Sequence, residues 1–233
     1  MISLHDLAVK HNAKKDAPCL ELYADAFETI RGHQLNILEM GVQGGGSLKM
    51  WSEFFPNSRV VGIDFNDVST TAQAERVQFF QGRQEDRGFL QSVCELSGID
   101  KFDIIIDDAS HFALYTKMSY DILFDDHLKR GGFYIIEDWG TGFWDEWPDG
   151  SRYQIISSEQ EISGRESRFV YRPDEATGLL PKLFASHQFG MVGFVKQLVD
   201  EAHYGAIRNV EIRRPSKFKQ MIVKEQVVMI TKL

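Results

Sequence analysis

Two acidic pairs in the sequence carry side chains that could bind a metal ion and move a proton. Asp107 and Asp108 follow three isoleucines, His111 stands three residues after Asp108, and Glu137 and Asp138 follow a second apolar run. Carboxylates held close together resist ionising at the same time unless a cation lies among them. Mg²⁺ (or Mn²⁺) suits such a set better than zinc, because no cysteine and only one histidine is nearby. The alternative is that these acids cap helices or pair with Lys129 and Arg130.

The elements that position these side chains alternate between short β-type runs and amphipathic stretches. This alternation is typical of a parallel sheet covered by helices on both faces, so we expect an α/β fold with a doubly wound, seven-stranded, mostly parallel sheet. The expected strands are Leu35–Met40, Arg59–Asp64, Val77–Gln81, Phe102–Asp107, Gly132–Glu137, Ile207–Arg213 and Met221–Thr231. The expected helices are Ser47–Phe55, Phe89–Leu96, Tyr115–Leu128 and Met191–His203.

The last two expected strands are joined only by the segment RPSKFKQ, residues 214–220. This link is too short for a right-handed helical crossover, so we expect the two strands to form an antiparallel hairpin. Such a hairpin would break the all-parallel pattern of a domain that binds NAD.

The composition favours one large domain. The chain has 233 residues, 43% of them hydrophobic, which is enough to bury the core of a single α/β domain over 1–233. We expect an N-terminal helical segment at 1–34. The stretch 139–178 shows no clear periodicity, and we interpret it as a lid or substrate-loop insertion.

Charge and cysteine content exclude several partner classes. The net charge of −8 gives no overall electrostatic reason to bind nucleic acid or an anionic membrane. Cys19 and Cys94 have the spacing of neither a disulfide framework nor a thiolate zinc site. We find no apolar run of the length of a membrane span and no signal-peptide core, so we expect a cytoplasmic protein.

A glycine-rich turn lies between the first expected strand and the helix after it. In ILEMGVQGGGS, residues 37–47, the backbone can pass close to a ligand at a helix N-terminus. The dinucleotide pattern GxGxxG would require glycine in place of Gln43. The pattern present is ExGxxxG, with Glu39, Gly41 and Gly45, which weakens the NAD interpretation.

Two further segments suit a nucleoside. Asp64 ends the second strand, where an acid can accept hydrogen bonds from both hydroxyls of a ribose. The segment QGRQED, with Gln84 and Asp86, follows the third strand, where a loop can hold an adenine edge. A glycine turn alone can be merely a tight turn, and a strand-end aspartate can cap a helix. Their order along the chain favours a cofactor site.

These features resemble the class I S-adenosylmethionine-dependent methyltransferases, whose Rossmann-like sheet has seven strands with the last one antiparallel. The resemblance implies that Glu39, Gly41 and Gly45 hold the methionine end of the cofactor and that Asp64 holds its ribose. It also places Gln84 and Asp86 near the adenine. Strands four and five are neighbours in that fold, so the two acidic pairs are expected to converge beside the cofactor.

The motifs DDxSH and IEDW resemble a narrower group, the metal-dependent sugar O-methyltransferases of the macrocin and mycinamicin type, with the related rhamnosyl O-methyltransferase and cephalosporin hydroxylase group. The resemblance implies that Asp108, Glu137 and Asp138 are metal ligands and that His111 is the general base. Asp107 either serves the cofactor or acts as a cap. The residues expected to contact substrate are Trp139, Thr141 and Trp144, although the aromatic ones would also suit a packed lid.

The activity implied by this resemblance is Mg²⁺-assisted methylation of a hydroxyl on a sugar or glycosylated natural product. A metal-bound hydroxyl has a lowered pKa, and an imidazole with an ordinary pKa of about 6.5 can remove its proton. We expect a homo-oligomer with a small-molecule partner. One alternative is a hydroxylase of the cephalosporin hydroxylase group, although the sequence offers no facial triad of two histidines and a carboxylate. The other is a non-catalytic cofactor-binding assembly protein.

Overall fold

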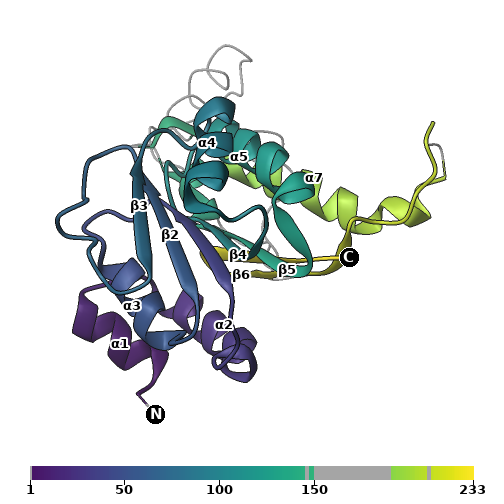
Figure 1. The fold of residues 1–233 in the computed structure, drawn as a ribbon. Helices are drawn as coiled ribbons and strands as arrows, with labels where there is room; N and C mark the ends of the chain where they lie inside the picture. The colour runs from purple at the N-terminus through teal and green to yellow at the C-terminus, as the bar shows by residue number, and fades with distance from the viewer. Residues whose placement is uncertain (1, 145–146, 150–189, 209–210) are drawn as a thin grey trace, which may run out of the picture.

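The computed structural model describes residues 2–144, 147–149, 190–208 and 211–233 (Figure 1). Most of the expected insertion at 139–178 lies outside these ranges, and with it the choice between a lid and a substrate loop. Among the helices that the model describes, none has the length and apolar character needed to cross a membrane.

A seven-stranded sheet organises the chain, in the order β3-β2-β1-β4-β5-β7-β6. The strands are β1 (Asn36–Met40), β2 (Arg59–Asp64), β3 (Val77–Gln81), β4 (Phe102–Asp107), β5 (Leu128–Glu137), β6 (Phe218–Lys224) and β7 (Val227–Lys232). The first five run parallel, whereas β7 is antiparallel to both β5 and β6. The predicted fold class is therefore confirmed.

The predicted boundaries of the last two strands are wrong. The described residues of Ile207–Arg213 form no strand, and the expected strand Met221–Thr231 contains the turn of the hairpin. Strands β6 and β7 pair across Glu225 and Gln226, and Gln226 has a φ of 62°. This turn lacks the Asn-Gly or Asp-Gly signal of a tight hairpin, so the apolar residues on both sides of it resemble one continuous strand.

Two helical layers cover the sheet (Figure 1). One face carries α1 (Leu4–His11), α2 (Ala17–Phe27) and α3 (Gly46–Phe54); the other carries α4 (Arg87–Ser97), α5 (Ala113–Asp126) and α7 (Gly190–His203). The short helices are η1 (Glu28–Ile30), η2 (Trp139–Phe143) and η4 (Tyr204–Ala206). Ile104 and Ile106 pack on the first layer and Ile105 on the second, because β4 is buried on both faces.

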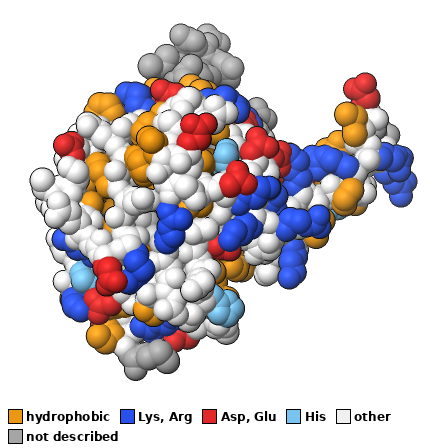
Figure 2. Space-filling view, viewed as in Figure 1, with side chains coloured by type: hydrophobic (Ala, Val, Ile, Leu, Met, Phe, Trp, Pro, Cys, Tyr) orange, Lys and Arg blue, Asp and Glu red, His pale blue; other side chains and the backbone are white. Residues whose placement is uncertain are grey.

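Lys and Arg side chains gather where α7 and the segment after it project from the rest of the molecule (Figure 2). Within this basic region Arg214 forms a 2.6 Å ion pair with Glu201 of α7, and its guanidinium lies 3.8 Å from the centre of the Tyr204 ring. These contacts hold Arg214 to α7 and η4, so its position has a structural explanation that needs no anionic ligand.

Candidate active site

A cavity of about 640 Å³ opens at the carboxyl ends of the central strands. Open α/β sheets bind their ligands at this edge. The cavity wall combines the glycine loop, the loops after β2 to β4 and the start of the segment after β5. Its lining includes Gly41, Gly44, Gly46, Asp64, Gln84, Asp108, His111, Asp138 and Trp147.

The glycine loop requires glycine at Gly41 and at Gly45, where φ is positive. Gly41 has a φ of 82°, and a Cβ added there would lie 2.1 Å from the carbonyl oxygen of Asp108. Gly45 has a φ of 77°, and its added Cβ would lie 2.6 Å from Ala72 Cα. The loop is thus packed closely against its neighbours, and Gly41 ties the end of β1 to the first residue after β4.

Replacing Gly41 by alanine should disturb both the loop and the segment that carries Asp108. We expect the free energy of unfolding to fall by about 2–4 kcal/mol, because the Cβ overlaps backbone atoms and the left-handed conformation disfavours alanine. Urea unfolding measures this change. The matched control is Gly44→Ala, since a Cβ at Gly44 meets nothing within 4 Å. Equal stability of the two variants would contradict this view of the loop.

Asp64 lies at the cavity wall and orders the glycine loop. Its Oδ2 accepts hydrogen bonds from the backbone N–H groups of Val42 and Gln43, both at 2.9 Å, and its Oδ1 accepts one from Asn66 at 2.8 Å. Its expected contact with a ribose stays a prediction, and the structure adds a second role, which is to fix the loop between β1 and α3.

Asp107 belongs to a buried network behind the cavity rather than to the cavity wall. Its carboxylate accepts hydrogen bonds from Gln84 Nε2 at 3.0 Å and from Ser119 Oγ at 2.8 Å, while Gln84 Oε1 accepts one from the Ser110 N–H at 2.9 Å. Burial raises the pKa of Asp107. The network joins the loops after β3 and β4 to α5, so Asp107 fixes these loops in place, and its expected contact with the cofactor stays a prediction.

The structure places Asp86 at the start of α4, and its expected contact with the adenine stays a prediction. Asp86 is exposed and caps α4 by accepting a 3.0 Å hydrogen bond from the backbone N–H of Phe89. It does not line the cavity, whereas Arg83, Gln84 and Glu85 from the same segment do. A capping aspartate and a cofactor aspartate are alike in sequence, because both directly precede a helix.

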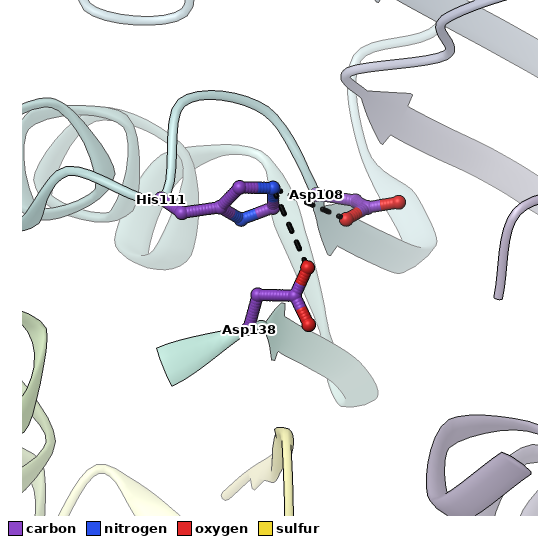
Figure 3. Close-up of side chains that lie close together, drawn as sticks. All are labelled: Asp108, His111 and Asp138. Carbon is purple, nitrogen blue, oxygen red and sulfur yellow. Dashed lines mark ion pairs between the residues drawn. The ribbon is translucent and has the colours of Figure 1, made fainter. Parts of the chain in front are cut away.

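The side chains of Asp108, His111 and Asp138, which we call the outer acidic group, face one another at the cavity (Figure 3). His111 Nε2 lies 3.8 Å from Asp108 Oδ1 and 3.6 Å from Asp138 Oδ2. His111 and Asp138 have φ angles of 49° and 52°, a left-handed conformation that is uncommon outside glycine and that recurs at functional sites. Thr141 Oγ1 donates a 2.8 Å hydrogen bond to the His111 carbonyl. Thr141 therefore fixes the backbone of His111, and the two carboxylates lie beside its ring.

A second set of carboxylates, Glu39, Asp108 and Glu137, forms what we call the inner acidic group. The Nζ atom of Lys15 lies among them, 2.7 Å from Glu39 Oε1, 2.6 Å from Asp108 Oδ2 and 2.7 Å from Glu137 Oε1. The predicted metal ligands are thus divided between two groups that share Asp108. Glu137 faces Lys15 and does not line the cavity.

The inner group also changes the expected role of Glu39. Its carboxylate is fully buried, pairs with Lys15 and accepts a 2.6 Å hydrogen bond from Ser47 Oγ at the start of α3. It does not line the cavity and fixes the glycine loop from behind, and its expected contact with the methionine end of the cofactor stays a prediction. A strand-end carboxylate next to a glycine loop gives no sign in the sequence of which side it faces.

The electrostatics of the outer group fit a hard divalent cation. Burial raises the pKa of Asp108, and Glu137 adds to this rise while Lys15 opposes it. Burial also raises the pKa of Asp138, against the opposing effect of His111. Carboxylates that are reluctant to ionise together gain from a bound cation, and their oxygens are the ligands that Mg²⁺ prefers. Asp108 and Asp138 both line the cavity, where such an ion could reach them.

None of the three predicted substrate residues lines the cavity, so their contact with a substrate stays a prediction. Trp139 packs against the core and donates a 2.9 Å hydrogen bond to the Lys224 carbonyl, and Thr141 is fully buried. Trp144 is 37% exposed but does not line the cavity. Trp147 does line it, and its ring lies edge-on to His111 with the ring centres 5.3 Å apart. Trp147 is therefore the best-placed of these aromatic residues to meet a ligand.

Known proteins with a similar sequence are O-methyltransferases. No family model matches the sequence. The 8-demethyl-8-alpha-L-rhamnosyl tetracenomycin-C 2'-O-methyltransferase of Streptomyces olivaceus is 32% identical over 228 residues, which are 88% of this chain and 57% of the relative. Mycinamicin VI 2''-O-methyltransferase of Micromonospora griseorubida is 39% identical over 129 residues, which are 52% of this chain and 31% of the relative.

The solved structure of MycE methyltransferase from the mycinamycin pathway, in complex with Mg and SAH, superposes with a TM-score of 0.75 at 25% identity, covering 99% of this chain and 54% of that chain. The chain has the class I methyltransferase fold. Its relatives are sugar O-methyltransferases of macrolide and tetracenomycin pathways. The chain spans only 31–57% of the length of the two curated relatives described above.

Within this methyltransferase fold the sheet ends in the antiparallel strands that the sequence predicts, although the sixth strand begins at Phe218 and not at Ile207. The cavity lies at the glycine loop, the outer acidic group lies after β4 and β5, and the inner acidic group lies at the ends of β1, β4 and β5. The methyltransferase fold thus brings together the cavity and the acidic groups, the two features from which an activity can be inferred.

Proposed function

We propose that this protein is an S-adenosylmethionine-dependent, Mg²⁺-assisted O-methyltransferase that acts on a sugar hydroxyl of a glycosylated natural product. The observation that carries this proposal is the outer acidic group, which opens onto the same cavity as the glycine loop and holds His111 Nε2 within 3.8 Å of two carboxylates. The relatives support it, because they are named as methyltransferases of glycosylated natural products.

The cofactor would lie along the glycine loop. Gly41 and Gly44 let the backbone approach a ligand closely, and Asp64, on the same wall, is available to a ribose. Gln84 lines the wall after β3 and is held by Asp107 and Ser110, so its position is fixed before a ligand binds. Preorganised walls lower the entropic cost of binding.

The metal would be held by Asp108 and Asp138, with Glu137 adding negative charge behind Asp108. A bound Mg²⁺ would lower the pKa of the acceptor hydroxyl and orient its oxygen. His111 Nε2 accepts the hydroxyl proton, and the carboxylates of Asp108 and Asp138 stabilise the imidazolium that forms. S-adenosylmethionine, when bound, would supply the methyl group, and the demethylated cofactor would be the leaving group. Trp147 packs against the imidazole and limits its movement.

Methyl transfer to a panel of deoxysugar glycosides, followed by mass spectrometry, tests this proposal. We expect a methylated glycoside that forms only when S-adenosylmethionine and Mg²⁺ are both present, with production lost after chelation and restored by added Mg²⁺. Full activity in the presence of chelator would contradict the role of the metal. A hydroxylated product in place of a methylated one would favour the hydroxylase alternative. The homo-oligomer predicted from the sequence can be tested on the same preparation by sedimentation velocity.

A further inference from the structure

Lys15 is a buried cation at the centre of the inner acidic group. It lies in the short link between α1 and α2, and its side chain is fully buried. Its Nζ atom lies within 2.7 Å of carboxylate oxygens of Asp108, Glu137 and Glu39. The ammonium group is therefore held as a charge by carboxylates from the ends of three neighbouring strands.

The inner acidic group has the dimensions of a cation site. Carboxylate oxygens of Glu39, Asp108 and Glu137 lie within 4.8 Å of one another, a spacing that could hold a metal ion. Two of these acids are fixed by further donors, since Ser47 Oγ donates to Glu39 and Tyr23 Oη donates to Glu137, both at 2.6 Å. The ammonium of Lys15 occupies the position that a metal would take.

The link that carries Lys15 is packed tightly against the glycine loop. A Cβ added at Gly46 would lie 2.5 Å from the His11 carbonyl oxygen and 2.9 Å from that of Asn12. Asn12 is in the left-handed conformation and caps α1. Asn12 and Lys15 also line the cavity wall. Lys15 is thus held by a closely packed segment of backbone at the edge of the proposed cofactor site.

We propose that Lys15 is a positioning residue that occupies the inner acidic group in place of a metal and so confines the divalent ion to the outer group. A buried set of three carboxylates requires a cation, and a covalently attached ammonium supplies one at every metal concentration. Asp108 can then offer its second oxygen to the cavity. The assignment of the outer group to the metal rests on the proposed function, whereas the occupation of the inner group rests on the ion-pair distances.

Metal stoichiometry, measured on the full chain with Mn²⁺ by electron paramagnetic resonance, tests this inference without any methyl transfer. We expect about one Mn²⁺ per wild-type chain and about two in Lys15→Met, because removal of the ammonium leaves three carboxylates without a cation. Without metal, we also expect Lys15→Met to have a lower melting temperature than the wild type. Added Mn²⁺ should raise the melting temperature of Lys15→Met by more than that of the wild type.

Two control variants test whether a change in Mn²⁺ stoichiometry is specific to the loss of the Lys15 charge. Lys15→Met/Glu39→Gln removes one positive and one negative charge together, so the inner group regains its net charge and should take up no second ion. Lys10→Met removes a lysine of the same N-terminal segment whose partner Glu53 is at the surface, with side chains 52% and 35% exposed. It should bind as many ions as the wild type.

Unchanged stoichiometry and no extra stabilisation by Mn²⁺ in Lys15→Met would overturn the inference. If Lys15→Met folds only when Mn²⁺ is present, the inference is supported. If Lys15→Met does not fold even with Mn²⁺, while Lys15→Met/Glu39→Gln does fold, the inference is wrong. A wild type that binds no Mn²⁺, beside a Lys15→Met variant that binds one, would contradict the metal site of the proposed function and leave the role of Lys15 intact.

Discussion

Replacing His111 by asparagine should lower kcat for methyl transfer by about 10²–10⁴-fold, the usual contribution of a positioned general base. Asparagine suits the test because it tolerates the left-handed backbone at a φ of 49°, where alanine would add strain. It cannot accept the proton as an imidazole does. Steady-state kinetics at saturating cofactor measure the loss, and calorimetry should show nearly unchanged binding of S-adenosylmethionine.

The control for this variant is His33→Asn. His33 is exposed and precedes β1, so it lies at the amino ends of the strands, whereas the cavity lies at their carboxyl ends. It should retain the wild-type rate. A His111→Asn variant that also retains this rate would remove His111 from proton transfer and leave it as a residue that positions Asp108 and Asp138.

Replacing Asp138 by asparagine should remove a metal ligand with little change of shape. Asparagine keeps the size of the side chain and tolerates the φ of 52°. We expect the affinity for Mg²⁺ to fall by more than about 100-fold, since even outer-shell partners of a metal are worth about 10–100-fold. Turnover at low Mg²⁺ should fall with it, and high Mg²⁺ should restore part of the loss.

A metal titration followed by calorimetry checks this prediction, with Asp121→Asn as the control. Asp121 lies on α5, is 51% exposed and pairs with Lys117 at the surface. Its loss should leave metal affinity unchanged. If Asp138→Asn binds Mg²⁺ as tightly as the wild type, the ion is held elsewhere, and the inner acidic group becomes the place to search.

The central parallel strands of the sheet could be predicted because they are buried on both faces. Such strands form short, continuous apolar runs that end in polar residues, as in β2 and β4, whose limits match those predicted. The final hairpin could not be placed in the same way. Its turn residues, Glu225 and Gln226, carry no turn signal, and the left-handed conformation of Gln226 is imposed by pairing between β6 and β7.

The acids of the site could be found in the sequence because they end strands. Their division between the buried network and the two acidic groups could not be predicted. Successive side chains of an extended chain point to opposite sides, so Asp107 turns to the buried network while Asp108 turns to the acidic groups. Glu137 and Asp138 are also divided between the inner and outer groups, and here the chain leaves the extended conformation at Asp138, whose φ is 52°. Adjacent acids in the sequence therefore have different neighbours and different roles.

Lys15 and Tyr23 could not be assigned from the sequence because their partners are distant along the chain. Lys15 is 93 residues from Asp108 and 122 from Glu137, and Tyr23 is 114 from Glu137. Neither stands in a motif, and in an amphipathic N-terminal segment each would be interpreted as a surface or packing residue. Only the docking of this segment onto the sheet brings them to the acids.

Calorimetric titration of S-adenosylmethionine into the protein in the presence of Mg²⁺ tests the central claim most directly, because it requires no knowledge of the sugar substrate. We predict saturable binding of about one cofactor per chain, as expected for one cavity at the carboxyl edge of the sheet. Binding should weaken strongly in Gly41→Ala, whose added Cβ would lie 2.1 Å from the Asp108 carbonyl oxygen. Absence of any binding to the wild type would contradict the assignment of this cavity to a methyltransferase cofactor.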